Sequence, residues 1–357
     1  MILVAVSPGE VRAAALDGAG RVCDFALARP GAPDGIGDLY HGRVVRRVPA
    51  MAGAFVVIGS ESDGFLPDTA GAAGLAEGSS IVVRITRSAQ GGKGPRLVRE
   101  EAEMPGPVGL IRRGPDAVLR LAALWPAAPI LVDDALSQAR LAAALPGRVH
   151  AGPGFDSALE AELAGLGEAT LALPGGAIGR IHPTPALVAI DIDAASAATS
   201  PHTVLNRAVI PELARQLRLR NLSGAILIDL AGLSSRQRKA FAPDFVTALR
   251  TDPLKPRFLG FTALGFAEIV RPRAASPLHE LLSGPHAAGL AALRAAAKES
   301  LATPKRSFVL RAAPPVARAL ERDPVALSEL GRRTGRALKL SIDPALGREG
   351  WTLEEAK

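Results

Sequence analysis

Two short apolar runs, each ending in a carboxylate, form the clearest pattern along the chain. Residues 186–193 read Ala-Leu-Val-Ala-Ile-Asp-Ile-Asp, and residues 224–230 read Gly-Ala-Ile-Leu-Ile-Asp-Leu. Runs that are almost wholly apolar over this length are typical of strands buried on both faces. Residues 200–221 between them have Leu or Val at every fourth position, which indicates a helix. We therefore predict a strand–helix–strand crossover with both strands in one sheet.

The acidic ends of these two strands are the first candidates for chemistry. Neighbouring strands lie roughly 5 Å apart, so the carboxylates of Asp191 and Asp229 would be near enough to share one divalent cation. A plainer interpretation is that the two aspartates only cap helices or end strands. Spacing in the sequence does not separate these interpretations, and both stay open at this point.

Residues 37–100 carry a different pattern, of short β-prone runs parted by Gly, Pro, Ser and Asp. Five such runs in this segment predict a compact barrel of the OB type. The predicted strands are residues 40–48, 54–58, 63–66, 81–86 and 96–99.

Aromatic and basic residues gather in this predicted barrel. Aromatic residues make up only 4% of the chain, yet Tyr40, Phe55 and Phe65 fall within 26 residues. Rings that stack on bases, beside cations that follow phosphates, suit a platform for single-stranded nucleic acid. The alternative for Phe55 is a place in the core, because apolar residues flank it. The basic residues of the segment are Arg43, Arg46, Arg47, Arg84, Arg87, Lys93 and Arg96.

The remaining segments alternate between strand and helix patterns. Residues 1–36 predict two or three short strands that complete a sheet elsewhere. After the crossover, residues 236–251 predict a helix and residues 260–270 a single strand. Residues 276–357 begin with a long helix and continue as a small α/β pattern. Three arginines near the end of the crossover helix form either a solvated face or part of a phosphate track; these are Arg215, Arg218 and Arg220.

Composition narrows the classes of protein. The net charge of +7 and the pI of about 10.1 favour an anionic partner, most commonly nucleic acid, although a GC-rich genome that prefers arginine would give the same balance. The single cysteine, Cys23, excludes a disulfide within the chain and a cysteine-rich zinc site. The N-terminus lacks a signal-peptide pattern, and no run of 18 uncharged apolar residues occurs. We therefore expect no membrane span and a cytoplasmic location.

Several of these segments together resemble the ribonuclease E/G family. Three runs in the predicted barrel resemble the family's S1 domain, and the loop Gly91-Gly92-Lys93-Gly94 resembles its lysine loop. The crossover strands and the helix between them resemble the catalytic, DNase I-like part. The resemblance keeps the family's order over nearly the whole chain. The segments are residues 37–44, 54–59, 63–67, 91–94, 186–193, 213–222, 226–229 and 260–265.

The resemblance implies a mixed α/β fold, in which an S1/OB barrel is inserted in an RNase H-like and DNase I-like core with a small C-terminal α/β domain. It implies domain boundaries as follows: N-terminal strands of the RNase H-like part at 1–36, the S1/OB RNA-binding domain at 37–100, a 5′-sensor or RNase H-like region at 101–176, the DNase I-like catalytic domain at 177–275, and the C-terminal small domain at 276–357.

The resemblance also implies a function and its residues. Asp191 and Asp229 match the aspartates that hold Mg²⁺ in the family, and Asn206 matches a nearby asparagine that would orient a phosphate or a metal-bound water. The barrel residues expected to bind single-stranded RNA are Phe55, Phe65, Lys93, Tyr40 and Arg43. The family cuts single-stranded RNA and leaves 5′-phosphate and 3′-hydroxyl ends.

Three departures from the family pattern change these expectations. Asp193 stands where the family has asparagine, so the metal site carries an additional carboxylate. The cysteines of the family's zinc link are absent, so we expect no zinc, and any homodimer would form without a zinc link. The stretch that matches the 5′-end pocket, residues 109–114, keeps Arg113 but lacks the usual threonine. We therefore expect weak recognition of a 5′-terminal phosphate.

These observations lead to one main hypothesis and two alternatives. The main hypothesis is a magnesium-dependent endoribonuclease acting on single-stranded RNA in RNA processing or decay. The first alternative is a non-catalytic RNA-binding protein that keeps the barrel but has a degenerate site. The second is a nuclease that acts on DNA through the same metal chemistry. The presence of both Asp191 and Asp229 favours the enzyme.

Overall fold

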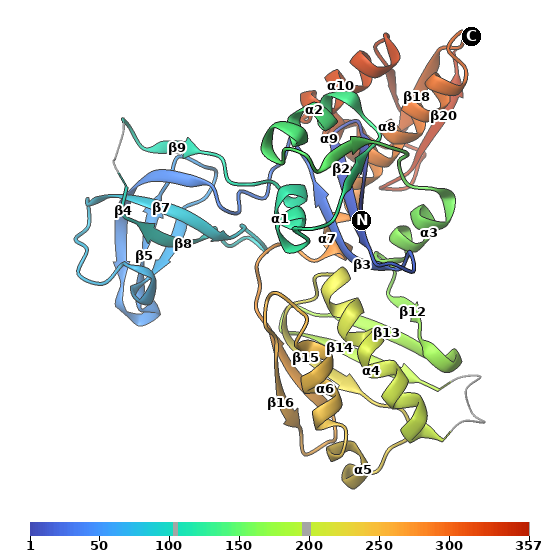
Figure 1. Ribbon diagram of the computed structural model, residues 1–357. Helices are drawn as coiled ribbons and strands as arrows, with labels where there is room; N and C mark the ends of the chain where they lie inside the picture. The colour runs from blue at the N-terminus through green and yellow to red at the C-terminus, as the bar shows by residue number, and fades with distance from the viewer. Residues whose placement is uncertain (103–105, 195–200, 357) are drawn as a thin grey trace.

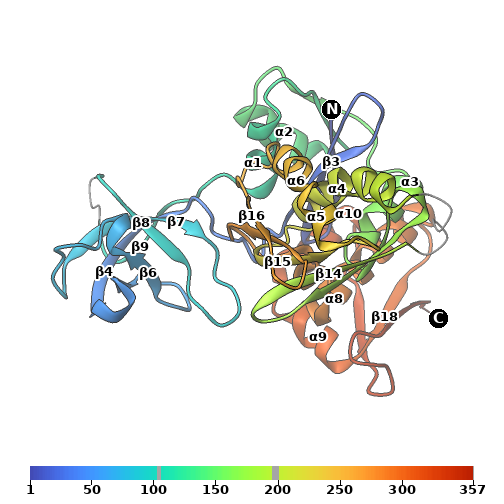
Figure 2. The ribbon, with the colours of Figure 1, turned by 90° about the horizontal axis from the view of Figure 1, so that it is seen from below.

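A computed structural model describes the chain except for residues 103–105, 195–200 and 357. The described residues form a mixed α/β protein with four sheets, which confirms the predicted fold class, including the closed barrel. Figures 1 and 2 show the barrel standing apart from the rest of the molecule. None of the described helices is long and apolar enough to cross a membrane.

The barrel closes through pairing of its first two strands, β4 and β5. Its core holds alternate residues of its strands, such as Val44, Val56 and Ile81, while the residues between them face outward. An additional strand, β9, pairs with the outer edge of β4. The elements are β4 (Leu39–Val48), β5 (Gly53–Val57), β6 (Gly64–Pro67), β7 (Ser80–Arg87), β8 (Arg96–Glu100) and β9 (Gly109–Arg112), with 3-10 turns η1 (Pro49–Met51) and η2 (Asp68–Ala70).

A second sheet joins the segments on either side of the barrel. Its strand order is β11-β10-β1-β2-β3, so the N-terminal strands pair with strands that follow the barrel in sequence. The barrel is therefore an insertion between two parts of one sheet. The elements are β1 (Ile2–Ser7), β2 (Glu10–Leu16), β3 (Val22–Ala28), α1 (Ala117–Leu124), β10 (Ile130–Val132), α2 (Ala135–Ala144), β11 (Val149–Ala151) and α3 (Ser157–Gly165).

The third sheet contains the two strands that end in carboxylates. Its order is β12-β13-β14-β15-β17-β16, and β14 and β15 are parallel neighbours, as the crossover predicts. The elements are β12 (Thr170–Ala172), η3 (Pro174–Gly176), β13 (Ile178–Pro183), β14 (Leu187–Asp193), α4 (His202–Leu219), β15 (Gly224–Asp229), α5 (Ser235–Lys239), α6 (Ala242–Leu249), β16 (Arg257–Phe261) and β17 (Ala267–Arg271).

Two predictions for this sheet are wrong. Residues 260–270, expected as one strand, belong to the hairpin β16–β17, which turns near Gly265 with a φ of 95° that favours glycine. Residues 236–251, expected as one helix, divide into α5 and α6.

The described helices of this segment pack on one face of the third sheet. Val188, Ile190 and Ile228 pack in one core with Leu205 and Leu213 of α4. Side chains alternate along a strand, so Asp191 and Asp229 lie on the opposite, open face. Figures 1 and 2 show α4 and α6 together on the covered side.

The arginines at the end of α4 serve neither as a solvated face nor as a phosphate track. Arg218 forms a two-point pair with the buried carboxylate of Asp24 on β3. Arg220 is only 5% exposed and donates to the backbone carbonyls of Gly165, Leu166 and Glu168. These side chains fasten the third sheet to the second.

The C-terminal domain packs its three-stranded sheet, β19-β18-β20, against helices and docks on the second sheet. Glu329 accepts from the Gly9 amide at 2.7 Å, and Arg333 donates to the Val6 carbonyl at 2.8 Å. The elements are α7 (Leu278–Leu281), α8 (Gly284–Ala302), β18 (Phe308–Ala312), α9 (Pro314–Glu321), α10 (Pro324–Thr334), β19 (Lys339–Ile342) and β20 (Trp351–Glu355).

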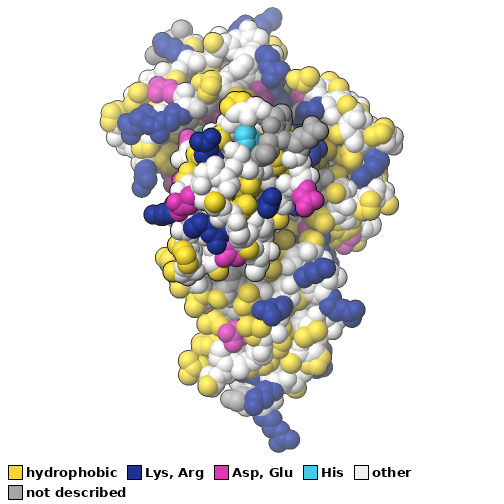
Figure 3. All heavy atoms as spheres, turned by 90° about the vertical axis from the view of Figure 1, so that its left-hand side faces the viewer, with side chains coloured by type: hydrophobic (Ala, Val, Ile, Leu, Met, Phe, Trp, Pro, Cys, Tyr) yellow, Lys and Arg dark blue, Asp and Glu magenta, His cyan; other side chains and the backbone are white. Residues whose placement is uncertain are grey.

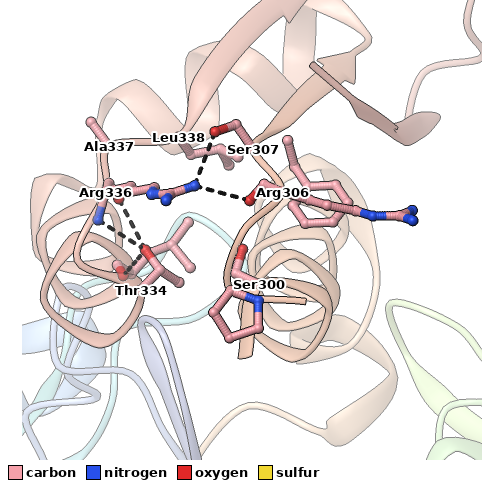
Figure 4. A pocket seen from close by; sticks show the side chains of 10 residues that line it. Ser300, Arg306, Ser307, Thr334, Arg336, Ala337 and Leu338 are labelled. Atoms are coloured by element: carbon pink, nitrogen blue, oxygen red, sulfur yellow. Dashed lines mark hydrogen bonds between the residues drawn. The ribbon is translucent and has the colours of Figure 1, made fainter. Parts of the chain in front are cut away.

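A small pocket in this domain has a volume of about 50 Å³. In Figure 4 the guanidinium of Arg336 points toward the Arg306 carbonyl and the Ser307 hydroxyl and donates to both at 3.1 Å. Arg336 therefore ties two backbone segments together, and the remaining space is too small for a nucleotide.

Candidate active site

Asp191 and Asp229 are direct register partners at the carboxyl ends of the parallel strands β14 and β15. Their side chains are 55% and 42% exposed, so a ligand on the open face of the sheet would reach both. The carboxyl ends of parallel strands are where ligands commonly bind in α/β sheets. The structure thus brings together the two acids that the sequence proposed as a pair.

Neither aspartate caps a helix in the part of the chain that the structure describes. The N-cap residue of α4 is Pro201, without a side-chain cap, and that of α5 is Ser234, which caps its own helix. The carboxylates of Asp191 and Asp229 instead face arginines. This geometry removes the capping interpretation that the sequence left open.

Two arginines that sequence reasoning missed flank the acids. Arg180 on β13 pairs across the strands with Asp191, and its Nη1 lies 3.6 Å from Asp191 Oδ2 and 3.2 Å from Asp193 Oδ2. Arg238 on α5 donates to Asp229 Oδ1 at 2.7 Å and to the Gly265 carbonyl at 2.8 Å. Arg180 was missed because its strand, β13, was not predicted from the sequence.

The pair fits a magnesium ion in its donor chemistry. Each arginine contacts one oxygen of its partner, and the other carboxylate oxygens, Asp191 Oδ1 and Asp229 Oδ2, have no hydrogen-bond partner among the described residues. Mg²⁺ usually takes one or two carboxylates and completes its shell with water and substrate phosphate. No group of three His, Cys, Asp or Glu residues that could hold a metal occurs in the described part of the chain, so water and substrate would complete this shell.

Asn206 lies in the core, on the side of the sheet opposite the acids. Its side chain has no exposed surface, and its Nδ2 donates to the His202 carbonyl at 2.6 Å and to the Ala231 carbonyl at 2.9 Å. The role expected from the sequence, contact with a phosphate or a metal-bound water, does not match this burial. Asn206 instead connects the first turn of α4 to the chain just after Asp229, which makes it a positioning residue.

The barrel carries the predicted aromatic pair on its outer surface. Phe55 and Phe65 are half-buried register partners with ring centroids 5.6 Å apart in an edge-to-face arrangement. The guanidinium of Arg46 lies 5.2 Å from the centre of the Phe55 ring. Phe55 thus lies outside the barrel core, and both rings keep surface for a base to stack on.

Tyr40 is a correction to the predicted RNA-binding set. It is only 9% exposed and packs in the barrel core, in the same strand phase as Val44. Burial, aided by the charge of Asp38, raises the pKa of its phenol. Tyr40 therefore offers no stacking surface, whereas Arg43, in the opposite phase, is exposed.

The two remaining predicted residues, Lys93 and Arg113, differ in whether an ion pair holds the side chain. Lys93 is exposed at a tight turn, in which Gln90 and Lys93 exchange backbone hydrogen bonds. Arg113 is more than half exposed, but it donates to the buried carboxylate of Asp38 at 2.6 Å, which balances its charge. Arg113 by itself is therefore a weak candidate for a 5′-phosphate pocket.

Comparison with known proteins connects this geometry to a family. Residues 152–274, which include both aspartates and Asn206 but not the barrel, match the family model described as the ribonuclease E/G family.

Individual relatives match over part of the chain. A ribonuclease E of Nostoc sp. is 39% identical over 115 residues, 30% of this chain and 17% of the relative. Ribonuclease G of Escherichia coli is 30% identical over 152 residues, 38% of this chain and 31% of the relative. A ribonuclease E/G-like protein of Pyropia yezoensis is 33% identical over 104 residues, 28% of this chain and 20% of the relative. The matched part thus spans less than a third of each of these relatives, and residues 152–274 carry the similarity to the ribonuclease E/G family.

Proposed function

We propose that this protein is a magnesium-dependent endoribonuclease that cuts single-stranded RNA and leaves 5′-phosphate and 3′-hydroxyl ends. The observation that carries the proposal is the register pairing of Asp191 with Asp229 on the open face of a sheet that matches the ribonuclease E/G family. We also propose that it works in the cytoplasm, in RNA processing or decay.

The residues at and near the open face of the sheet would have different roles in the reaction. Asp191 and Asp229 would hold the ion. When bound, magnesium would activate a water for attack on phosphorus and offset charge on the phosphate. Arg180 and Arg238 fix the orientation of the two carboxylates and place positive charge beside the same face. Asn206 acts indirectly, because it keeps α4 aligned with the end of β15.

The barrel would bind the substrate. The edge-to-face pair Phe55 and Phe65 offers rings for unpaired bases, and the exposed cations Arg43 and Lys93 would follow the phosphates. Figure 3 shows Lys and Arg side chains spread over the barrel side of the molecule, with Asp and Glu side chains among them. The exposed cations on this side favour an RNA strand as the partner.

The ion pair of Arg113 with Asp38 affects how the enzyme would recognise the 5′ end of its substrate. Because Arg113 is held by Asp38 and no threonine follows it, we propose that the enzyme discriminates little between 5′-monophosphate and 5′-hydroxyl strands through this residue. A homodimer, if one forms, would be held by apolar contacts and not by zinc.

The proposal is tested by incubating the purified protein with matched single-stranded RNA and DNA oligomers, in magnesium and in EDTA. We expect cleavage of the RNA alone, only with magnesium, and 5′-phosphate ends on the products. RNA binding without cleavage would favour the degenerate, non-catalytic protein. Equal cleavage of the DNA oligomer would favour a DNA nuclease.

A further inference from the structure

Five side chains form one continuous row across the outside of the barrel. Arg46 is the register partner of Phe55, Phe55 of Phe65, Phe65 of Arg96, and Arg96 of Arg87. The row therefore crosses all five barrel strands. In order it consists of one arginine, two phenylalanine rings and two more arginines. All five side chains are exposed or half-buried, while Ala54 and Val56 beside Phe55, Leu66 beside Phe65 and Leu97 beside Arg96 lie in the core. The stacking rings thus have a pair of arginines on the side away from Arg46.

The arginine end of this row meets the segment that leaves the third sheet. Ser88, next to Arg87, donates its backbone amide to the Ala274 carbonyl at 3.0 Å. Ala274 follows Arg273, so this bond holds Arg87 near Arg273 at the seam between the barrel and the rest of the molecule. A second bond, from Gln90 Nε2 to Glu280 at 3.2 Å, fastens the same barrel loop.

Three arginines at the seam, Arg87, Arg96 and Arg273, bring positive charge together. No ion pair to Arg87, Arg96 or Arg273 occurs within the described part of the chain, and the carboxylate of Glu280 accepts from Gln90 instead. Burial, together with the like charges of Arg96 and Arg273, lowers the pKa of the Arg87 guanidinium. Three cations held together in this way are stabilised when an anion joins them.

Arg273 connects the seam to the strand that carries Asp229. Its Nη2 lies 2.7 Å from where a side chain on Gly224 would begin, so only glycine leaves room for the guanidinium there. Gly224 begins β15, and Asp229 ends it, roughly 17 Å further along at the usual rise per residue. A strand bound across the rings and the seam would therefore point toward the sheet that holds the two acids.

We propose that Arg87, Arg96 and Arg273 together form a phosphate-binding site at the seam, which holds the backbone of a nucleic-acid strand lying across Phe55 and Phe65. Guanidinium groups suit this ligand because each can donate two parallel hydrogen bonds to a phosphate. The ligand is either an internal phosphodiester or a 5′-terminal phosphate. The identity of the strand as RNA rests on the proposed function.

The test measures binding without metal, so that cleavage does not interfere. A single-stranded RNA labelled at its 3′ end is titrated with the full chain in EDTA at several salt concentrations, for wild type, Arg273→Gln, Arg96→Gln and Arg87→Gln. The matched control is Arg332→Gln, an exposed arginine of the C-terminal domain. Thermal unfolding of each variant checks the fold, and Arg96, which is exposed, is the variant least able to disturb it.

We expect each seam variant to bind about tenfold more weakly. The slope of log affinity against log salt should fall by about 0.7 for each phosphate that the variant no longer neutralises. Arg332→Gln should match wild type. If the variants lose affinity equally for 5′-hydroxyl, 5′-monophosphate and internally labelled circular strands, the bound group is an internal phosphodiester. If they lose affinity only for the 5′-monophosphate strand, the bound group is the terminal phosphate.

Two results would overturn the inference, and they are distinguishable. Wild-type affinity and salt slope in folded Arg96→Gln and Arg273→Gln, with RNA still bound, would remove the seam site alone. Absence of RNA binding by the wild-type protein would remove both the seam site and the proposed function.

Discussion

Asp191 on β14 and Asp229 on β15 are register partners across a parallel strand pair, and each carboxylate faces an arginine from a neighbouring element. Both acids are exposed on the open face of the sheet, and neither caps a helix of the described part of the chain. Arg180 and Arg238 offset part of the repulsion between the two acids, and each leaves the other oxygen of its carboxylate available to a metal ion.

The stacking pair gives the first prediction. Stacking of a base on an aromatic ring is worth roughly 1–3 kcal/mol, so Phe65→Ala should weaken binding of single-stranded RNA about tenfold or more while the protein stays folded. Lys93→Ala should reduce the slope of log affinity against log salt by about 0.7, the value for one phosphate of a single strand. Fluorescence anisotropy across a salt series measures both. Unchanged affinity in a folded Phe65→Ala protein would show that this ring has no part in binding.

A second prediction concerns the residue that departs from the family. Asp193 shares Arg180 with Asp191, and its side chain is 45% exposed. Asp193→Asn removes one negative charge and restores the residue usual in the family, while Asp191 and Asp229 keep both of their carboxylates. We expect this variant to cleave RNA at a rate similar to wild type, measured as kcat/KM. A loss as large as that of Asp229→Asn would place Asp193 among the metal ligands.

A third prediction separates structural arginines from RNA-binding ones. Arg218→Met leaves the carboxylate of Asp24, 8% exposed, with the Trp125 indole as its one remaining hydrogen-bond donor among the described residues. Loss of one partner of a buried pair costs about 3 kcal/mol or more, so the free energy of unfolding should fall by that amount. The control is Arg140→Met, whose exposed pair with Asp116 should be worth about 1 kcal/mol or less. Weaker RNA binding by folded Arg218→Met, at unchanged stability, would contradict this assignment.

The fourth prediction concerns zinc. One cysteine in the chain cannot supply two thiolates from each of two subunits to a shared four-thiolate site. Elemental analysis of the purified protein should find no stoichiometric zinc, and a chelator should leave its oligomeric state unchanged. Stoichiometric zinc, or dissociation of a dimer by the chelator, would refute the prediction.

The features that the sequence predicted well are those set by local pattern. The five barrel strands, the crossover and the acidic ends of β14 and β15 follow from alternation and apolar runs within single elements. The same alternation could have placed Tyr40 correctly, since it is in phase with the core residue Val44.

The features that the sequence did not predict depend on which strands become neighbours. Arg180 reaches Asp191 only because β13 pairs with β14, and its short, glycine-containing run gave little signal. Arg218 was ambiguous because its partner, Asp24, is 194 residues away in the chain. The row from Arg46 to Arg87 likewise exists only once five strands close into a barrel.

The most direct test of the central claim is magnesium-dependent cleavage of single-stranded RNA by Asp191→Asn and Asp229→Asn, with RNA binding and thermal unfolding measured alongside. Each substitution removes a charged oxygen ligand from a hard-cation site and loosens an exposed ion pair worth about 1 kcal/mol or less. We predict that both variants lose cleavage while RNA binding persists and stability without magnesium changes little. Full cleavage by both single variants at limiting magnesium would contradict the metal assignment and leave an RNA-binding protein in its place.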